Sequence, residues 1–169
     1  MDLTHQVLAT PKIQSLILGE PKEDALISGQ SVLRQALHAL LLFFAKTYDS
    51  VFGLGTGPPV HDPVAVAVLL SNLNPAMGHR ETSKNMLNFS DNDGERFVVN
   101  VVTDGQHGTD PLHTGQLGRT IVKPVPGGNK VGGIAVPRGV DVDAFWDMIM
   151  DCIQRADQWN IARSERKGL

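Results

Sequence analysis

The chain has 169 residues, of which 41% are hydrophobic and 20% are charged. This length allows one sizeable hydrophobic core but not two ordinary domains, so we expect a single globular domain. The 15 basic and 18 acidic residues give a net charge of -3 without a basic run, which argues against a nucleic acid partner.

The sequence also lacks the marks of a secreted or membrane-spanning protein. Its single cysteine, Cys152, has no partner for an internal disulfide, and its apolar neighbours predict a small core residue rather than a nucleophile. The N-terminus has no cationic segment followed by an apolar run, and the longest apolar stretches, residues 39–45 and 64–70, are too short to cross a bilayer. These features predict a cytoplasmic protein that makes no membrane contact.

Two helices are predicted in the N-terminal third of the chain. Thr10 followed by Pro11 is typical of an N-cap with proline in the first turn, and predicts a short helix that ends at Leu18. Apolar residues then recur at intervals of three and four from Ser31 to Tyr48, which predicts a long amphipathic helix.

A third helix is predicted after the glycine- and proline-rich residues 53–59. Asp62 followed by Pro63 repeats the pattern of a cap and a proline, so Asp62 is expected at the N-cap of a helix that carries residues 64–70. Because these residues are apolar on nearly every side, we expect the helix to be buried.

Strands are expected in the second half of the chain. Residues 96–102 are β-branched and nearly continuously apolar, which predicts a strand covered on both faces. Residues 118–125 and 131–136 are two further candidates, each followed by proline. Helices interleaved with a few apolar strands indicate the α/β class.

A last helix is predicted from Asp141 or Asp143, either of which is a suitable N-cap, to about Trp159. Its expected apolar face consists of Phe145, Ile149, Cys152, Ile153 and Ala156.

Three patterns resemble ligand-binding motifs but are better explained as turns. Gly53, Gly55 and Gly57 follow a helix and run into prolines, whereas a dinucleotide-binding loop follows a strand. Residues 90–95 suggest a calcium loop, but its first ligand position falls on Phe89, whose side chain has no oxygen.

The third pattern is a glycine-containing segment, residues 104–115, that carries two aspartates and two histidines. Asp104, His107, Asp110 and His113 match no standard zinc spacing, so we interpret this segment as a flexible loop.

His61 and Asp62 combine ionisable chemistry with a defined place at the start of a helix. An aspartate that caps backbone N–H groups is a sufficient structural explanation for Asp62. The same carboxylate is also suited to a hard cation such as Ca²⁺, and a histidine titrates near neutral pH. The pair therefore allows either a helix cap or a hydrolytic site with a metal and a proton donor.

Several segments of the chain resemble the inosine-uridine-preferring nucleoside hydrolases and follow one another in the order of that family. GPPVHDPVAVAVLL, residues 57–70, is similar to the family's His-Asp-Pro signature. The other similar segments are DLTHQVLATP, LLLFFAKTYDSVFG, RFVVNVVTDG, TGQLGRTIVKP and VDVDAFWDMIMDCI. The resemblance covers nearly the whole chain, and the later segments look most like those of fungal members.

The resemblance implies an α/β fold with a mixed sheet flanked by helices, and calcium-dependent cleavage of the N-glycosidic bond of ribonucleosides. It implies that Asp62 is a calcium ligand and that His61 assists departure of the nucleobase. Tyr48 is the matching candidate for an aromatic side chain near the base, although a half-buried core residue explains it equally well.

Two motifs of the family are absent from the chain. One is an aspartate cluster of the form Asp-x-Asp-Pro-Gly-x-Asp-Asp, which supplies further calcium ligands and the catalytic base, and the other has a Glu-Phe-Asn core that holds ribose. By this resemblance, residues 1–169 form the C-terminal part of one nucleoside hydrolase domain. Because Ca²⁺ takes about six to eight oxygen ligands, we expect weak binding by Asp62 alone and little or no hydrolase activity from the isolated chain.

Three functions remain open on this evidence. The first is nucleoside hydrolysis, and the second is a truncated, non-enzymatic remnant that acts through protein association. The third is a small α/β binding domain in which His61 and Asp62 only begin a helix. The preferred nucleoside is undetermined, and the family's dimers and tetramers suggest a homo-oligomer without identifying its interface. Uncovered sheet edges and helix faces predict a chain prone to aggregation.

Overall fold

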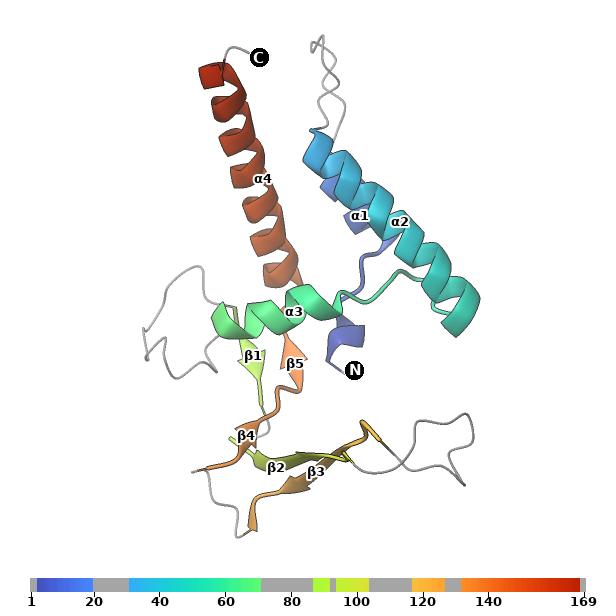
Figure 1. Ribbon diagram of the computed structural model, residues 1–169, viewed down its shortest axis with the longest axis vertical. Helices are drawn as coiled ribbons and strands as arrows, with labels where there is room; N and C mark the ends of the chain where they lie inside the picture. The colour runs from blue at the N-terminus through green and yellow to red at the C-terminus, as the bar shows by residue number, and fades with distance from the viewer. Residues whose placement is uncertain are drawn as a thin grey trace. The chain divides into compact units, whose positions relative to one another are not determined.

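The computed structural model describes residues 3–19, 31–70, 87–91, 94–103, 117–126 and 132–167 (Figure 1). The chain divides into two compact units. The helical unit consists of Met1–Phe89 and Val140–Leu169, and the sheet unit consists of Ser90–Gly139. Helices and strands follow one another along the chain, which confirms the α/β class.

The first two α-helices begin at side-chain caps, as their sequences predict. A 3-10 turn, η1 (Thr4–Gln6), precedes α1 (Pro11–Leu18), where Thr10 Oγ1 accepts a hydrogen bond from the Ile13 N–H at 3.4 Å. Helix α2 (Val32–Phe52) begins after Ser31, whose hydroxyl oxygen accepts from the Arg34 N–H at 3.1 Å.

Helix α2 continues one turn beyond the predicted end at Tyr48. It ends where Gly53 adopts the left-handed conformation, with a φ of 68°. Such a conformation is costly for residues with a Cβ atom, so the first glycine after the apolar stripe is the natural place for the helix to end.

The residues between α2 and α3 pack against the N-terminal segment. The Ala9 N–H donates to the Pro58 carbonyl at 2.9 Å, and the Val60 N–H donates to the Val7 carbonyl at 3.1 Å. At Gly57, which has a φ of 135°, an added Cβ atom would lie 2.6 Å from the Ala9 carbonyl oxygen. Gly57 therefore permits a close backbone approach within the turn that the sequence predicts here.

Helix α3 (His61–Ala67) begins two residues earlier than predicted, and the predicted cap at Asp62 is wrong. Val60 occupies the N-cap position, where no side chain makes a capping hydrogen bond, and Asp62 lies in the first turn. The first N–H groups of a helix lack intrahelical partners, so Pro63 is tolerated as the third residue of α3 and does not mark its start.

The prediction that this third helix is buried is also wrong for one of its faces. Val64 and Ala67 are buried, whereas Val66 is 61% exposed. The 3-10 turn η2 (Val68–Leu70) continues α3 and leaves Leu69 62% exposed. Only the side of a short surface helix that faces the core is buried, even when the other side carries apolar residues.

Helix α4 (Val142–Lys167) begins at one of the two predicted caps, because Asp141 Oδ1 accepts from the Ala144 N–H at 2.9 Å. It runs past the predicted end near Trp159, since the charged residues that follow are good helix formers. Phe145 is buried as predicted.

The prediction that Cys152 is a core residue is wrong. Cys152 is exposed, and its sulfur lies 3.2 Å from a guanidinium nitrogen of Arg155 on the same helix. Ile153, the next residue, turns toward the core and is 7% exposed. One residue along a helix corresponds to about 100° of rotation, which is sufficient to separate a buried side chain from an exposed one.

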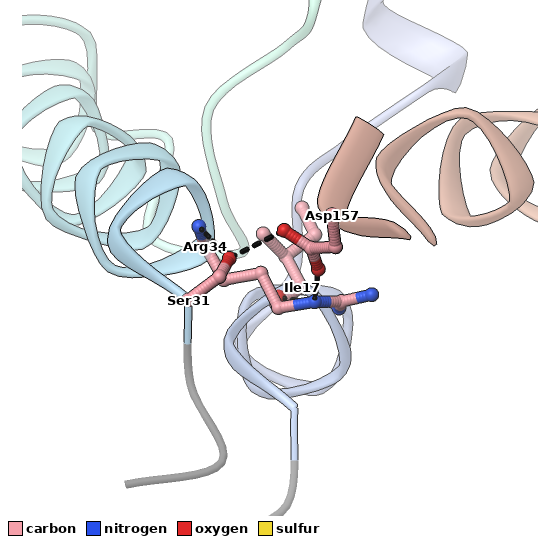
Figure 2. Close-up of polar contacts among 4 residues, drawn as sticks. All are labelled: Ile17, Ser31, Arg34 and Asp157. Atoms are coloured by element: carbon pink, nitrogen blue, oxygen red, sulfur yellow. Dashed lines mark hydrogen bonds and ion pairs between the residues drawn. The ribbon is translucent and has the colours of Figure 1, made fainter. Parts of the chain in front are cut away.

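A polar clasp joins the C-terminal half of α4 to the start of α2 and the end of α1 (Figure 2). The Asp157 carboxylate of α4 accepts from the Ser31 hydroxyl and from Arg34 Nε, both at 2.5 Å. Arg34 Nη1 also donates to the Ile17 carbonyl of α1 at 2.9 Å. Both charged side chains are about 15% exposed, so the ion pair is mostly shielded from water.

The core of the helical unit is formed by its N-terminal segment and by α1, α3 and α4. Its buried side chains are Val7, Ala9, Ile17, Val64, Ala67, Leu87, Phe89, Phe145, Trp146 and Ile153. Helix α2 contributes no fully buried residue and packs partly buried leucines against this core.

The sheet unit contains an antiparallel three-stranded sheet in the order β3-β2-β4 (Figure 1). Its strands are β2 (Arg96–Val101), β3 (Thr120–Pro124) and β4 (Ile134–Ala135), all within the predicted ranges. Two short strands, β1 (Phe89–Ser90) and β5 (Gly139–Val140), pair separately.

The expectation that the strand over residues 96–102 is covered on both faces is wrong for the part of the chain that the structure describes. Phe97 is buried, but Val98 is 44% exposed and Val101 is 55% exposed. Burial of both faces is typical of parallel sheets with helical crossovers, whereas antiparallel strands of this kind can leave one face open.

No helix among the described residues is long and apolar enough to span a bilayer. The predicted flexible loop, residues 104–115, lies outside the described residues.

Candidate functional site

A cleft of about 540 Å³ lies within the helical unit and contains the predicted site residues at one side. Helices α1, α2 and α4 supply its apolar wall, which includes Leu41 and Phe145. The segment from Pro58 to Pro63 supplies the remaining wall, which carries His61 and Asp62. The cleft therefore combines an apolar interior with a few ionisable groups, as small-molecule sites commonly do.

His61 is half-buried at the first position of α3 and is held from the N-terminal segment. Its Nδ1 atom lies 2.6 Å from the Thr4 hydroxyl oxygen, across a separation of 57 residues in the sequence. No hydrogen bond engages the other ring nitrogen, Nε2, among the residues that the structure describes. Nε2 is therefore the His61 atom available to a molecule in the cleft.

Tyr48 and His61 line the same part of the cleft. The two ring centroids are 6.3 Å apart. Tyr48 also contacts Phe52, one turn along α2, with a centroid separation of 5.4 Å. His5 approaches His61 from η1 at 5.6 Å between centroids. The four rings form an aromatic cluster around a titratable imidazole.

Asp62 is exposed beside the cleft and makes no hydrogen bond or ion pair within the described ranges. It lies in the first turn of α3, where N–H groups without intrahelical partners favour a negative charge. Its carboxylate oxygens are accordingly free to contact a ligand or a cation.

The described residues do not by themselves fit a calcium site. No group of three or more histidine, cysteine, aspartate or glutamate side chains that could hold a metal ion occurs among them. Asp62 offers one carboxylate, whereas Ca²⁺ takes about six to eight oxygen ligands.

The other metal-binding patterns weighed from the sequence gain no structural support. Asp104, His107, Asp110 and His113 all lie outside the described residues. At the start of the suggested calcium loop, Phe89 is a buried residue of β1 and supplies no side-chain oxygen.

Three residues of the site were not identified from the sequence. Thr4 and His5 reach His61 only through the packing of η1 against α3. Trp146 lines the cleft and is 7% exposed, and its indole Nε1 has no hydrogen-bond partner among the residues that the structure describes. Trp146 directly follows Phe145 on α4. A wider predicted apolar face would have included it.

Comparison with known proteins yields one matching family and two similar relatives. The family model described as inosine-uridine preferring nucleoside hydrolase matches residues 1–147. A uridine nucleosidase of Saccharomyces cerevisiae is 29% identical over 163 residues, which cover 94% of this chain and 40% of the relative. A probable ribonucleoside hydrolase of Dictyostelium discoideum is 27% identical over 153 residues, which cover 90% of this chain and 36% of the relative. The chain thus spans about two fifths of the length of these relatives.

Proposed function

Because the chain belongs to the inosine-uridine preferring nucleoside hydrolase family, we propose that it takes part in hydrolysis of the N-glycosidic bond of ribonucleosides to free base and ribose. The observation that carries the proposal is the gathering of His61, Asp62 and Tyr48 on one cleft. The names of the two relatives, which refer to nucleosidase and ribonucleoside hydrolase activities, agree with it.

The reaction needs a proton for the departing base. The bond between C1′ of ribose and the base nitrogen breaks with its electron pair on the base. A water molecule adds its hydroxyl group to C1′ and releases its other proton to a base or to solvent. Glycoside cleavage of this kind passes through a transition state with oxocarbenium character, in which a proton donor at the leaving group lowers the barrier. We assign this role to Nε2 of His61, the ring nitrogen that Thr4 leaves free.

Tyr48 is proposed to contact the nucleobase. Its ring stands 6.3 Å from that of His61, so a base that receives a proton from His61 lies within reach of the tyrosine ring. An aromatic ring offers a flat apolar surface to a planar base.

Asp62 is proposed as one ligand of a calcium ion. The exposed carboxylate is suited to a hard cation, but the remaining oxygen ligands have to come from outside the described residues. A calcium titration followed by isothermal calorimetry tests this assignment, because Asp62→Asn should weaken binding while Asp151→Asn, an exposed aspartate of α4, should not. Equal affinities in both variants would contradict it.

The proposal further places the protein in the cytoplasm, with a small ribonucleoside as its ligand and with a homo-oligomer as its assembly. Size-exclusion chromatography with light scattering at several protein concentrations tests the last point.

The activity test measures ribose release from purine and pyrimidine nucleosides by the protein at its native length. An immunoblot against residues 160–169 establishes that length in the source cells. His61→Ala should lower kcat about 100-fold or more, the usual contribution of a positioned proton donor. His38→Ala is the matched control, because His38 lies on α2 outside the cleft lining.

Two results would contradict the enzymatic proposal. One is an unchanged kcat in the His61→Ala variant. The other is a native product no longer than this chain and without ribose release, which would favour the alternative of a non-enzymatic protein that acts through association.

A further inference from the structure

Thr4 forms a hydrogen bond with His61 but has no role in the reaction proposed above. Thr4 begins η1 and His61 begins α3, so each backbone is fixed by its own turn or helix. The 2.6 Å separation of Oγ1 and Nδ1 is short for a hydroxyl bonded to a ring nitrogen. Both side chains are half-buried, which limits competition from water.

A hydroxyl group is suited to this place because it both donates and accepts. When the imidazole is neutral with its hydrogen on Nε2, the Thr4 O–H donates to Nδ1. When the imidazole is protonated, its Nδ1–H donates to Thr4 Oγ1 after the hydroxyl hydrogen rotates. The same contact therefore serves the acid and the ring that it leaves behind. The imidazolium gives its Nε2 proton to the base, and the neutral ring that remains keeps its Nδ1–H bonded to Thr4 Oγ1.

We propose that Thr4 is a positioning residue, which holds the His61 ring so that Nε2, the atom that gives up the proton, faces the cleft. The inference rests on the proposed function, in which His61 gives its proton to the departing base. Thr4 touches neither base nor ribose in this scheme and acts only through His61.

The rings around His61 do not replace this contact. Tyr48 and His5 approach the imidazole at centroid separations of 6.3 and 5.6 Å, with interplanar angles of 41° and 48°. Tilted rings at these distances restrict the position of the imidazole but do not select one ring nitrogen over the other. That selection comes from the hydroxyl group at Nδ1.

The first test is the nitrogen-15 NMR spectrum of the His61 ring in the full chain. Thr4→Val removes the hydroxyl group at nearly constant volume and should move the Nδ1 resonance of the neutral ring toward that of an unbonded acceptor nitrogen. Thr4→Ser should restore the wild-type position. Thr120→Val, an exposed threonine of β3 in the sheet unit, is the matched control and should leave the resonance unchanged.

The second test separates positioning from a loss of stability, and uses the protein at native length. Thr4→Val should lower kcat for a ribonucleoside on the order of tenfold, because a misaligned acid keeps part of its contribution. It should leave hydrolysis of a p-nitrophenyl riboside unchanged, because nitrophenolate departs without a proton. Thr4→Ser should recover the nucleoside rate.

An Nδ1 resonance that Thr4→Val does not move, or an equal loss on both substrates, would overturn the inference. Failure of the proposed function has a separate signature, a His61→Ala variant with unchanged nucleoside hydrolysis.

Discussion

Helices α2 and α4 are the two longest helices among the described residues, and they bury their apolar faces to different extents. Helix α4 buries Phe145 completely and leaves Trp146 and Ile153 only 7% exposed. Helix α2 has no buried residue, and its Phe43 and Phe52 are 66% and 65% exposed. An apolar pattern therefore indicates which face of a helix is suited to burial, but not whether another element packs against that face.

The difference also explains the shape of the cleft wall. The α4 side is packed against the core, so Phe145 and Trp146 form a fixed surface. The α2 side brings Leu40 and Phe44 to the same cleft while both remain partly open to solvent, at 52% and 41% exposure. We expect substitutions to affect stability strongly on α4 and weakly on α2.

The largest expected effect is that of Phe145→Ala. Removing a fully buried phenylalanine from a core costs about 3–5 kcal/mol, through lost burial and the cavity that remains. Urea unfolding followed by circular dichroism measures this loss directly. A cost below about 1 kcal/mol would mean that the core around α4 is not tightly packed, and the contrast with α2 would then fail.

Gly57→Ala tests how the segment between α2 and α3 packs against the N-terminal segment. A Cβ atom there meets the Ala9 carbonyl oxygen at 2.6 Å, and the φ of 135° is strained for any residue with a side chain. We expect a loss of about 2–3 kcal/mol in the free energy of unfolding. Gly53→Ala is the control, because its φ is 68° with no atom within 4 Å of the added Cβ, and should cost about 1–2 kcal/mol. Equal costs would show that contact with Ala9 does not matter.

Asp157→Asn tests the polar clasp that ties the start of α2 to α4. The substitution keeps the shape of the side chain but removes the charge that Arg34 and Ser31 contact. Because the pair is about 15% exposed, we expect a loss of about 1–2 kcal/mol rather than the larger cost of breaking a fully buried pair. Asp151→Asn is the control, since its pair with Arg155 is more than 60% exposed, and screening by water should leave it with a much smaller contribution. A loss as small as that of the control would show that the clasp does not stabilise the unit.

Local signals in the sequence were sufficient for most helix boundaries. Thr10, Ser31 and Asp141 each accept a backbone N–H at the helix start that the sequence indicates. Asp62 carries the same signal without capping, because Val60 occupies the N-cap position of α3. A cap residue followed by proline thus predicts the first residue of a helix only to within about one turn. Both residues are also tolerated inside the first turn.

The candidate site was predictable only in part. His61 and Asp62 are adjacent in the sequence, so their common position at the cleft needs no tertiary information. Thr4 and His61 are 57 residues apart in the sequence, and no periodic pattern predicts their contact. The sequence also does not show whether an apolar side chain is buried. The exposure of Val66 or Phe43 depends on which other elements pack against its helix.

The smallest expected effect, that of Phe43→Ala, is the most direct challenge to the contrast between the two helices. Phe43 is 66% exposed and forms an edge-on aromatic pair with the neighbouring Phe44 ring, at 5.8 Å between centroids. Loss of that pair is offset by the higher helix propensity of alanine, so the free energy of unfolding should change by no more than about 0.5 kcal/mol. Binding of the dye anilinonaphthalene sulfonate should fall, because the variant presents less apolar surface. If Phe43→Ala instead cost as much as Phe145→Ala, the apolar face of α2 would be covered in solution, and the contrast would apply to the single chain and not to the protein in its working state.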